Sequence, residues 1–116
     1  MIGVDLARIA IYVRPGVTDM RKAANGLSII ASEQMQLDPL SGALFLFYNR
    51  YRRIMKALLW DRNGFWPAQK KLERDQFPWP QSEEAAREIT VEQLKMLLDG
   101  IDFWRAHRSL NYQSVS

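Results

Sequence analysis

Basic side chains are concentrated in the middle of the chain, and they are the first candidates for function. Residues 50–74 carry eight lysine and arginine side chains against two carboxylates, and five of the eight are arginine. The guanidinium group of arginine presents a planar fork that matches the oxygens of a phosphate. The eight candidate nucleic-acid-binding residues are Arg50, Arg52, Arg53, Lys56, Arg62, Lys70, Lys71 and Arg74.

Aromatic residues are interleaved with these basic residues, as they would be on a surface that binds bent or single-stranded nucleic acid. They are Tyr48, Tyr51, Trp60, Phe65 and Trp66. A small sheet gives a similar pattern without any ligand, because its buried face is aromatic while its solvated face and edges are rich in lysine and arginine. Three interpretations therefore stay open: contact with nucleic acid, a solvated sheet face, and contact with an acidic protein partner.

Few side chains of this sequence suit catalysis or metal binding. The chain has no cysteine and a single histidine, His107, in a polar stretch. Cysteine nucleophiles and thiolate zinc sites are therefore excluded. Some carboxylates could be imagined as an acidic metal site, although each has a simpler role in a turn, a strand end or a helix start. They are Asp19, Asp61, and one of Glu73 or Glu92. We expect a non-enzymatic protein with no catalytic residue, metal or cofactor.

Length and composition are those of an ordinary globular domain. The 116 residues are 47% hydrophobic and 25% charged, with a formal net charge of +3. We expect a single domain over residues 1–104 and a flexible polar tail over 105–116. No run approaches the roughly 18 apolar residues of a membrane span, and the N-terminus lacks the pattern of a secretory signal. A cytoplasmic protein without membrane contact is the resulting expectation.

A strand and a helix are predicted in the first third of the chain. Alternating apolar residues predict a strand over residues 8–14, which Pro15 stops. Thr18 is the expected N-cap of the next helix, with Asp19 in its first turn. This helix should fade near Gln36, ahead of an Asp-Pro pair.

An antiparallel meander of three strands is predicted next. The apolar run 43–48 indicates a central strand covered on both faces, and a polar connection leads to a second strand over 54–60. Asn63 and Gly64 are the predicted centre of a two-residue hairpin, with a positive φ at Gly64. Pro67 removes one hydrogen-bond donor from the third strand, which should therefore lie at an edge of the sheet or contain a break.

Helical structure is predicted to return towards the C-terminus. Residues 77–80 indicate a rigid linker whose aromatic rings pack on the sheet, and a short acidic helical turn is expected over 83–88. Thr90 and Gln93 have the spacing of a capping box, and an apolar stripe follows that should face the sheet. The stripe consists of Val91, Leu94, Leu98 and Ile101, with Leu97 at its margin.

These elements predict an α+β fold in one small domain. An N-terminal strand–helix unit precedes the antiparallel β-meander, and the C-terminal helix packs on the sheet. The outer ridge of that helix should be mostly acidic, because residues 75–102 have a net charge of −5. The ridge consists of Glu92, Lys95, Asp99 and Asp102.

Several short motifs occur together in an order typical of a known family. They are Thr18-Asp19-Met20-Arg21-Lys22, Asp38-Pro39-Leu40-Ser41-Gly42-Ala43-Leu44-Phe45, Asn49-Arg50, Trp60-Asp61, Asn63-Gly64-Phe65-Trp66, Lys71-Leu72-Glu73 and Phe77-Pro78-Trp79-Pro80. Over residues 8–104 the chain resembles the TnpB-type accessory proteins of the sixty-six family of bacterial insertion sequences, not the RNA-guided nuclease of the same label. The resemblance implies a protein that is encoded beside a separate transposase and needed for transposition, with no established active site.

The residues and the resemblance together favour a DNA-associated accessory factor. The basic residues of 50–74 would hold the phosphate backbone with modest sequence preference, since no recognised groove-reading motif is present. The alternative is an adaptor that binds the transposase of the element through the C-terminal helix without contacting DNA. One protein could perform both roles, and its oligomeric state stays open.

Overall fold

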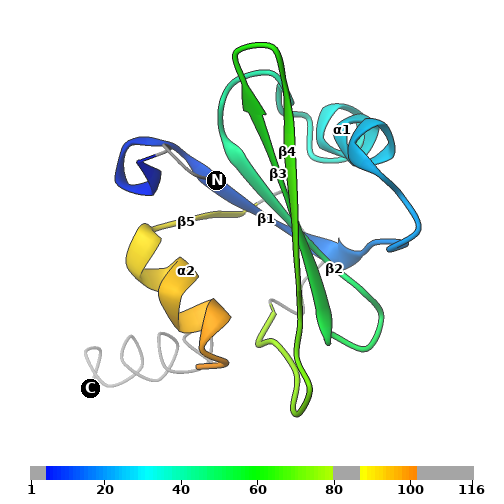
Figure 1. Cartoon of the computed structure of the whole chain (residues 1–116), viewed down its shortest axis with the longest axis vertical. Coiled ribbons are helices and arrows are strands. Elements are labelled where there is room, and N and C mark those ends of the chain that lie inside the picture. Colours follow the sequence, from blue (N-terminus) through cyan, green and yellow to red (C-terminus); the bar gives the residue numbers. More distant parts are fainter. Residues whose placement is uncertain (1–4, 80–86, 102–116) are drawn as a thin grey trace, which may run out of the picture.

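The computed structural model describes residues 5–79 and 87–101, in which a mixed five-stranded sheet separates two α-helices (Figure 1). The strand order is β4-β3-β2-β1-β5. β1 and β2 are parallel, and the other neighbouring strands are antiparallel. This architecture confirms the predicted α+β class. The strands are β1 Ile11–Val17, β2 Leu44–Tyr48, β3 Ile54–Asp61, β4 Gly64–Lys71 and β5 Arg87–Ile89; the α-helices are α1 Ala24–Glu33 and α2 Val91–Leu98, and a 3-10 helix spans Leu6–Arg8.

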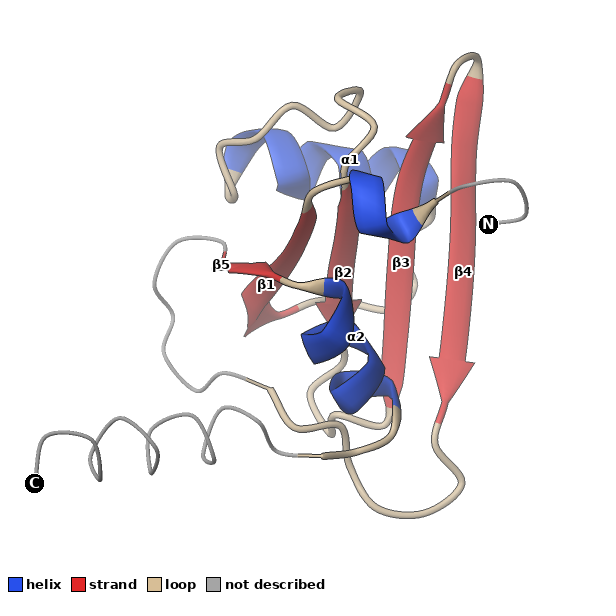
Figure 2. Ribbon diagram, turned by 90° about the vertical axis from the view of Figure 1, so that its left-hand side faces the viewer, coloured by secondary structure: helices blue, strands red, loops and turns tan. Residues whose placement is uncertain are grey.

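Apolar cores form on both faces of the sheet, because the central strands alternate between them. On one face α1 packs Leu27 and Ile30 against Phe45, Phe47 and Leu58. On the other face α2 packs on a cluster that includes the fully buried Val13, Leu46, Phe77 and Leu97. In Figure 1, α1 lies to the right of the sheet and α2 to its left, and Figure 2 shows the same layers after a quarter turn.

The N-terminal strand has the predicted length of seven residues but begins and ends three residues later than predicted. β1 continues through Pro15 to Val17, so the prediction that Pro15 stops the strand is wrong. The register between β1 and β2 shifts between Val13 and Val17, and this irregularity accommodates a proline inside the sheet. β1 and β2 are connected through α1, which is the crossover that parallel neighbours require.

The first helix begins at Ala24, six residues after the predicted N-cap Thr18. The reason is that Thr18 is already used by the sheet: its amide donates to the Tyr48 carbonyl at 2.9 Å, and its hydroxyl accepts from Arg14 at 2.9 Å. Asp19 likewise lies in a turn before the helix. α1 ends at Glu33, before the predicted Gln36.

The meander of β2, β3 and β4 is confirmed, with every residue of β2 buried and β4 at an edge. β3 and β4 are joined by a two-residue hairpin turn, as predicted, but the predicted centre of this turn is wrong by one residue. Asp61 pairs with Gly64, so the central residues are Arg62 and Asn63. The positive φ, 56°, belongs to Arg62 rather than Gly64. Pairing up to Gly64 extends both strands and leaves that glycine in ordinary strand conformation.

The C-terminal part confirms some predictions and corrects others. Thr90 and Gln93 form the predicted capping box, and Leu94 is buried. Leu97 is fully buried rather than marginal, whereas Ile101 lies beyond the helix and is half-exposed. Phe77 and Trp79 pack on the sheet, as predicted for the linker.

One predicted helical segment is a strand instead. Residues 87–88, expected at the end of an acidic helical turn, belong to β5, which pairs with the outer edge of β1. Backbone pairing with that free edge replaces helical hydrogen bonds. The predictions for 83–86, Asp102, the domain boundary at 104 and the tail 105–116 lie outside the described residues. None of the described helices has the length and hydropathy of a membrane span.

Candidate nucleic-acid interface

Five of the eight predicted basic residues meet at one end of the sheet, in two segments that hydrogen-bond to each other. Residues 49–53 connect β2 to β3, and residues 71–77 begin at the last residue of β4 and continue beyond it. The Leu72 amide donates to the Arg53 carbonyl at 2.8 Å, and the Phe77 amide donates to the Arg52 carbonyl at 2.7 Å. We call these two segments the basic end; both lie in the lower part of Figure 1. Its basic residues are Arg50, Arg52, Arg53, Lys71 and Arg74, against the carboxylates Glu73 and Asp75.

Asn49 fixes the shape of the β2–β3 connection. Its side-chain oxygen accepts hydrogen bonds from the amides of Arg53 at 2.9 Å and Ile54 at 3.0 Å. Its carbonyl accepts from the Arg52 amide at 2.9 Å, which closes a turn. Arg52 adopts φ 57°, a left-handed conformation that is uncommon outside glycine. The loop is therefore held by its backbone and Asn49, and the guanidinium groups of Arg50 and Arg53 are not needed to hold it.

Buried aromatic residues form a floor beneath this loop. The Tyr48 hydroxyl donates to the Pro15 carbonyl and the Trp79 indole donates to the Arg14 carbonyl, both at 2.7 Å. The two rings pack against each other at a tilt of 37°, with centroids 4.6 Å apart. Phe77 is also fully buried. The segment that carries Arg74 is therefore anchored before it by the Leu72 hydrogen bond and after it by Phe77.

The charges of the basic end are not neutralised by ion pairs within the described residues. Arg50, Arg53, Lys71 and Arg74 are exposed, and Arg52 is half-buried with Nη2 3.4 Å from the Gln76 side-chain oxygen. The ion pairs of the described chain are Arg8–Asp5, Arg21–Asp19 and Arg62–Asp61. Exposed cations without carboxylate partners attract a polyanion, and their attraction weakens with salt.

Two of the predicted residues, Lys56 and Lys70, bind backbone carbonyls instead. Lys56 Nζ donates to the carbonyls of Met20 at 2.7 Å and Lys22 at 2.9 Å on the α1 face. Lys70 Nζ donates to the Leu98 carbonyl at 3.0 Å, at the C-terminal end of α2, where the helix dipole favours a cation. They lie on opposite faces of the sheet, and the ammonium group of each is already hydrogen-bonded within the fold.

Arg62 lies at the far end of β3, in the hairpin turn. β3 has eight residues and spans about 24 Å. Arg62 Nε is 3.8 Å from an oxygen of Asp61, and the same carboxylate accepts from the Trp66 indole at 3.0 Å. The hairpin turn is thus a separate, internally paired site.

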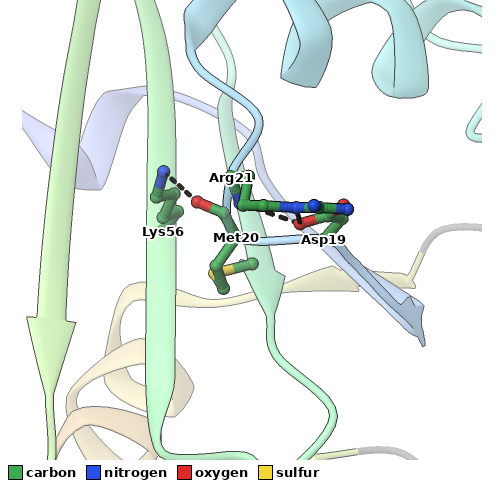
Figure 3. Close-up of polar contacts among 4 residues, drawn as sticks. All are labelled: Asp19, Met20, Arg21 and Lys56. Atoms are coloured by element: carbon green, nitrogen blue, oxygen red, sulfur yellow. Dashed lines mark hydrogen bonds and ion pairs between the residues drawn. The ribbon is translucent and has the colours of Figure 1, made fainter.

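A second basic segment, which was not among the predicted site residues, lies beside the last residue of β2. The loop 18–23 follows β1, and the Thr18 amide at its start donates a hydrogen bond to the carbonyl of Tyr48, the last residue of β2. Lys56 donates a hydrogen bond to the Met20 carbonyl of this loop (Figure 3). Lys22 is exposed. Arg21 and Asp19 form an ion pair with an Nη2–Oδ2 distance of 2.7 Å. The adjacent pair Arg21-Lys22 was a detectable signal, but the zero net charge of residues 1–49 concealed it.

The Asp19–Arg21 pair fixes the charge of this loop. Hydrogen bonds from the Arg21 side chain and amide hold the pKa of Asp19 at about 2, and the same carboxylate raises the pKa of Arg21. Arg21 is thereby neutralised by its neighbour, whereas Lys22 forms no ion pair with the described residues.

The acidic metal site considered from the sequence is not assembled. Asp19 pairs with Arg21 near the end of β2, whereas Asp61 lies in the hairpin turn. In the part of the chain that the structure describes, no group of three or more metal-ligating side chains occurs.

Comparison with known proteins supplies the family. The chain matches the family described as IS66 Orf2 like protein over residues 9–108. It belongs to this family. Two similar proteins come from Sinorhizobium fredii (strain NBRC 101917 / NGR234). Uncharacterized protein y4hO is 37% identical over 97 residues, 84% of each chain. Uncharacterized protein y4jC is 28% identical over 101 residues, 87% of this chain and 85% of y4jC. No solved structure matches the chain significantly.

Membership of the IS66 Orf2-like family confirms the resemblance found in the sequence and supports an accessory role in transposition. Several of the motifs that carried the resemblance surround the basic end. Asn49 and Arg50 open the β2–β3 connection, residues 71–73 begin at the last residue of β4, and residues 77–79 anchor the aromatic floor. Residues 18–22 form the loop that Lys56 holds.

Proposed function

We propose that this IS66 Orf2-like protein is a non-catalytic accessory factor of transposition that binds DNA through its basic end. One observation carries the proposal: five basic side chains lie on two mutually hydrogen-bonded segments, and none of them takes part in an ion pair of the described residues. Three of the five are arginines on one short, rigid loop. Such a cluster supplies the phosphate contacts that dominate DNA affinity.

The geometry favours recognition of the backbone over reading of base sequence. The basic residues lie on a loop and on a strand end, whereas neither described helix presents a basic face that could enter a major groove. Phosphate contacts orient a protein on DNA without sequence information. We therefore expect modest sequence preference.

Fluorescence anisotropy with DNA tests this function. Labelled duplex and single-stranded probes of the element ends, and unrelated probes of equal length, are titrated with the folded protein. Binding should fall steeply with salt, and Arg50→Ala with Arg53→Ala should weaken all sequences alike. Each lost phosphate contact should reduce the log–log salt slope by about one. Arg62→Ala is the matched control and should leave affinity unchanged. If no DNA of any form binds at about 50 mM salt, the proposal fails.

The alternative adaptor role is favoured by the outer face of α2. Glu92, Lys95, Met96 and Asp99 are exposed there, so an apolar side chain lies among charges. A pull-down with the transposase separates the two roles. Capture that survives Arg50→Ala with Arg53→Ala and is lost in Met96→Arg would support the adaptor and not the DNA-binding role.

A further inference from the structure

Among the interleaved aromatic residues, Tyr51 differs in its surroundings. Tyr48 is buried in the floor, and Trp60 and Phe65 pack on each other with centroids 5.0 Å apart. Trp66 is partly exposed but lies near the hairpin turn, where its indole is hydrogen-bonded to Asp61. Tyr51 is 66% exposed and lies inside the basic end, between Arg50 and Arg52. It is therefore the aromatic ring that a ligand of the basic end would meet.

The backbone of Tyr51 is fixed although its ring is exposed. The Tyr51 carbonyl accepts a hydrogen bond from the Gln76 side chain at 2.9 Å, and the turn closed by Asn49 holds the neighbouring Arg52. A tyrosine has only two side-chain torsions to order, so a ring presented on a fixed backbone binds at low entropic cost. Within the described residues the ring has no hydrogen bond or aromatic contact of its own.

Exposure of a large ring among arginines indicates what it binds. Removing such a ring from water is favourable, and a nucleobase offers a flat apolar face that stacks on it. In an intact duplex these faces are already covered by neighbouring base pairs. An unpaired strand offers both a free base for Tyr51 and phosphates for the arginines on either side.

We propose that Tyr51 is a base-stacking residue and that the basic end takes unpaired DNA, either a single strand or the open end of a duplex. The inference rests on the proposed DNA-binding function and narrows its ligand. Stacking on one ring does not read base identity, because every base has a π-face. The site should therefore tolerate sequence changes in the unpaired strand.

Matched probes test the inference. A single-stranded DNA without self-complementarity, its duplex, and an RNA of the same sequence carry the same label and are titrated at one salt concentration. The wild type should bind the single strand at least about fivefold more tightly than the duplex. Tyr51→Ala should weaken single-strand binding about tenfold and duplex binding less than about twofold. Tyr51→Trp should retain the preference, and Tyr51→Leu should lose it.

Trp66→Leu serves as the control, since it removes a partly exposed aromatic ring far from the basic end, and melting temperatures exclude unfolding of every variant. The inference is overturned if the duplex binds as tightly as the single strand, or if Tyr51→Ala weakens both probes equally or neither. RNA that binds more tightly than DNA would overturn the assignment to DNA. Absence of binding to every probe would refute the proposed function itself.

Discussion

The two connections of β3 resemble each other in composition and differ in their surroundings. The loop before β3 contains Arg52 at φ 57° beside the exposed Tyr51, and the turn after β3 contains Arg62 at φ 56° near the exposed Trp66. In the turn, one carboxylate, Asp61, lies 3.8 Å from Arg62 and accepts from Trp66. In the loop, the described residues supply no such carboxylate. An arginine beside an aromatic residue therefore becomes a candidate site only where no carboxylate neutralises its charge.

The largest contrast should come from reversing charge at the two connections. Arg50→Glu with Arg53→Glu places two negative charges on the basic end and should weaken DNA binding by about a hundredfold or more at low salt. Arg62→Glu should change affinity by less than about threefold, because that turn lies at the far end of the hairpin. Anisotropy titrations of both variants measure the ratio. Equal losses would mean that net charge alone, and not the basic end, attracts DNA.

Removing the ammonium group of Lys56 should affect stability first. Lys56→Met deletes two hydrogen bonds to the Met20 and Lys22 carbonyls and should lower the free energy of unfolding by about 1–2 kcal/mol. Chemical denaturation measures this loss. Arg62→Met, which removes a weak exposed ion pair, should lie within about 0.5 kcal/mol of the wild type. If Lys56→Met leaves stability unchanged but weakens DNA binding, Lys56 is a phosphate ligand after all.

Releasing Arg21 should strengthen binding moderately. Asp19→Asn removes the carboxylate that neutralises Arg21 in the loop next to the basic end, so DNA affinity should rise by a few fold and the log–log salt slope by about one. The control Asp61→Asn releases Arg62 at the far turn and should leave the slope unchanged. Unaltered binding by Asp19→Asn would separate the loop 18–23 from the interface.

The pH dependence of that ion pair follows from the pKa of Asp19. The folded-state value of about 2 is below the ordinary 3.8, so the pair is intact above pH 3.8 and is lost as the pH falls through 2. Between pH 5 and 8 the Asp19 carboxylate stays ionised, so the pair should add no pH dependence to DNA binding. An NMR titration should place the Asp19 carboxyl near 2 in the wild type. In Arg21→Gln the pKa should return towards its ordinary value, and an unchanged value would refute the role of Arg21.

The smallest effects should come from glycine substitutions. Arg52→Gly and Arg62→Gly both place glycine at a positive φ, which it adopts without steric cost, so neither should lower the melting temperature. Arg52→Gly should nevertheless weaken DNA binding by a few fold, whereas Arg62→Gly should not. A melting-temperature loss confined to Arg52→Gly would show that its side chain is structural.

The sequence predicted those parts of the fold that local patterns determine. The meander, the edge position of the strand with Pro67 and the Thr90–Gln93 capping box follow from alternation and spacing within a few residues. The late start of α1 did not, because Thr18 bonds to Tyr48, thirty residues later. β5 was likewise missed, since its pairing depends on the free edge of β1.

The candidate site shows the same division. Arg50, Arg52 and Arg53 lie on the connection that the sequence predicted, and Lys71 and Arg74 join them through the hairpin geometry. The sequence could not show that Lys56 and Lys70 have partners within the fold, because their ammonium groups bind carbonyls 34 or 36 and 28 residues away in the chain. Charge density along a sequence locates a basic segment, but only the fold determines which of its charges are already in use.

The most direct test of the basic end is an NMR map of its amides on titration with DNA. The account predicts that chemical shifts change mainly in residues 49–53 and 71–77, with smaller changes in residues 18–23. Arg62, Asn63 and α2 should remain unchanged. Shifts that concentrate on α2 or on the hairpin turn, with the basic end unaffected, would contradict it.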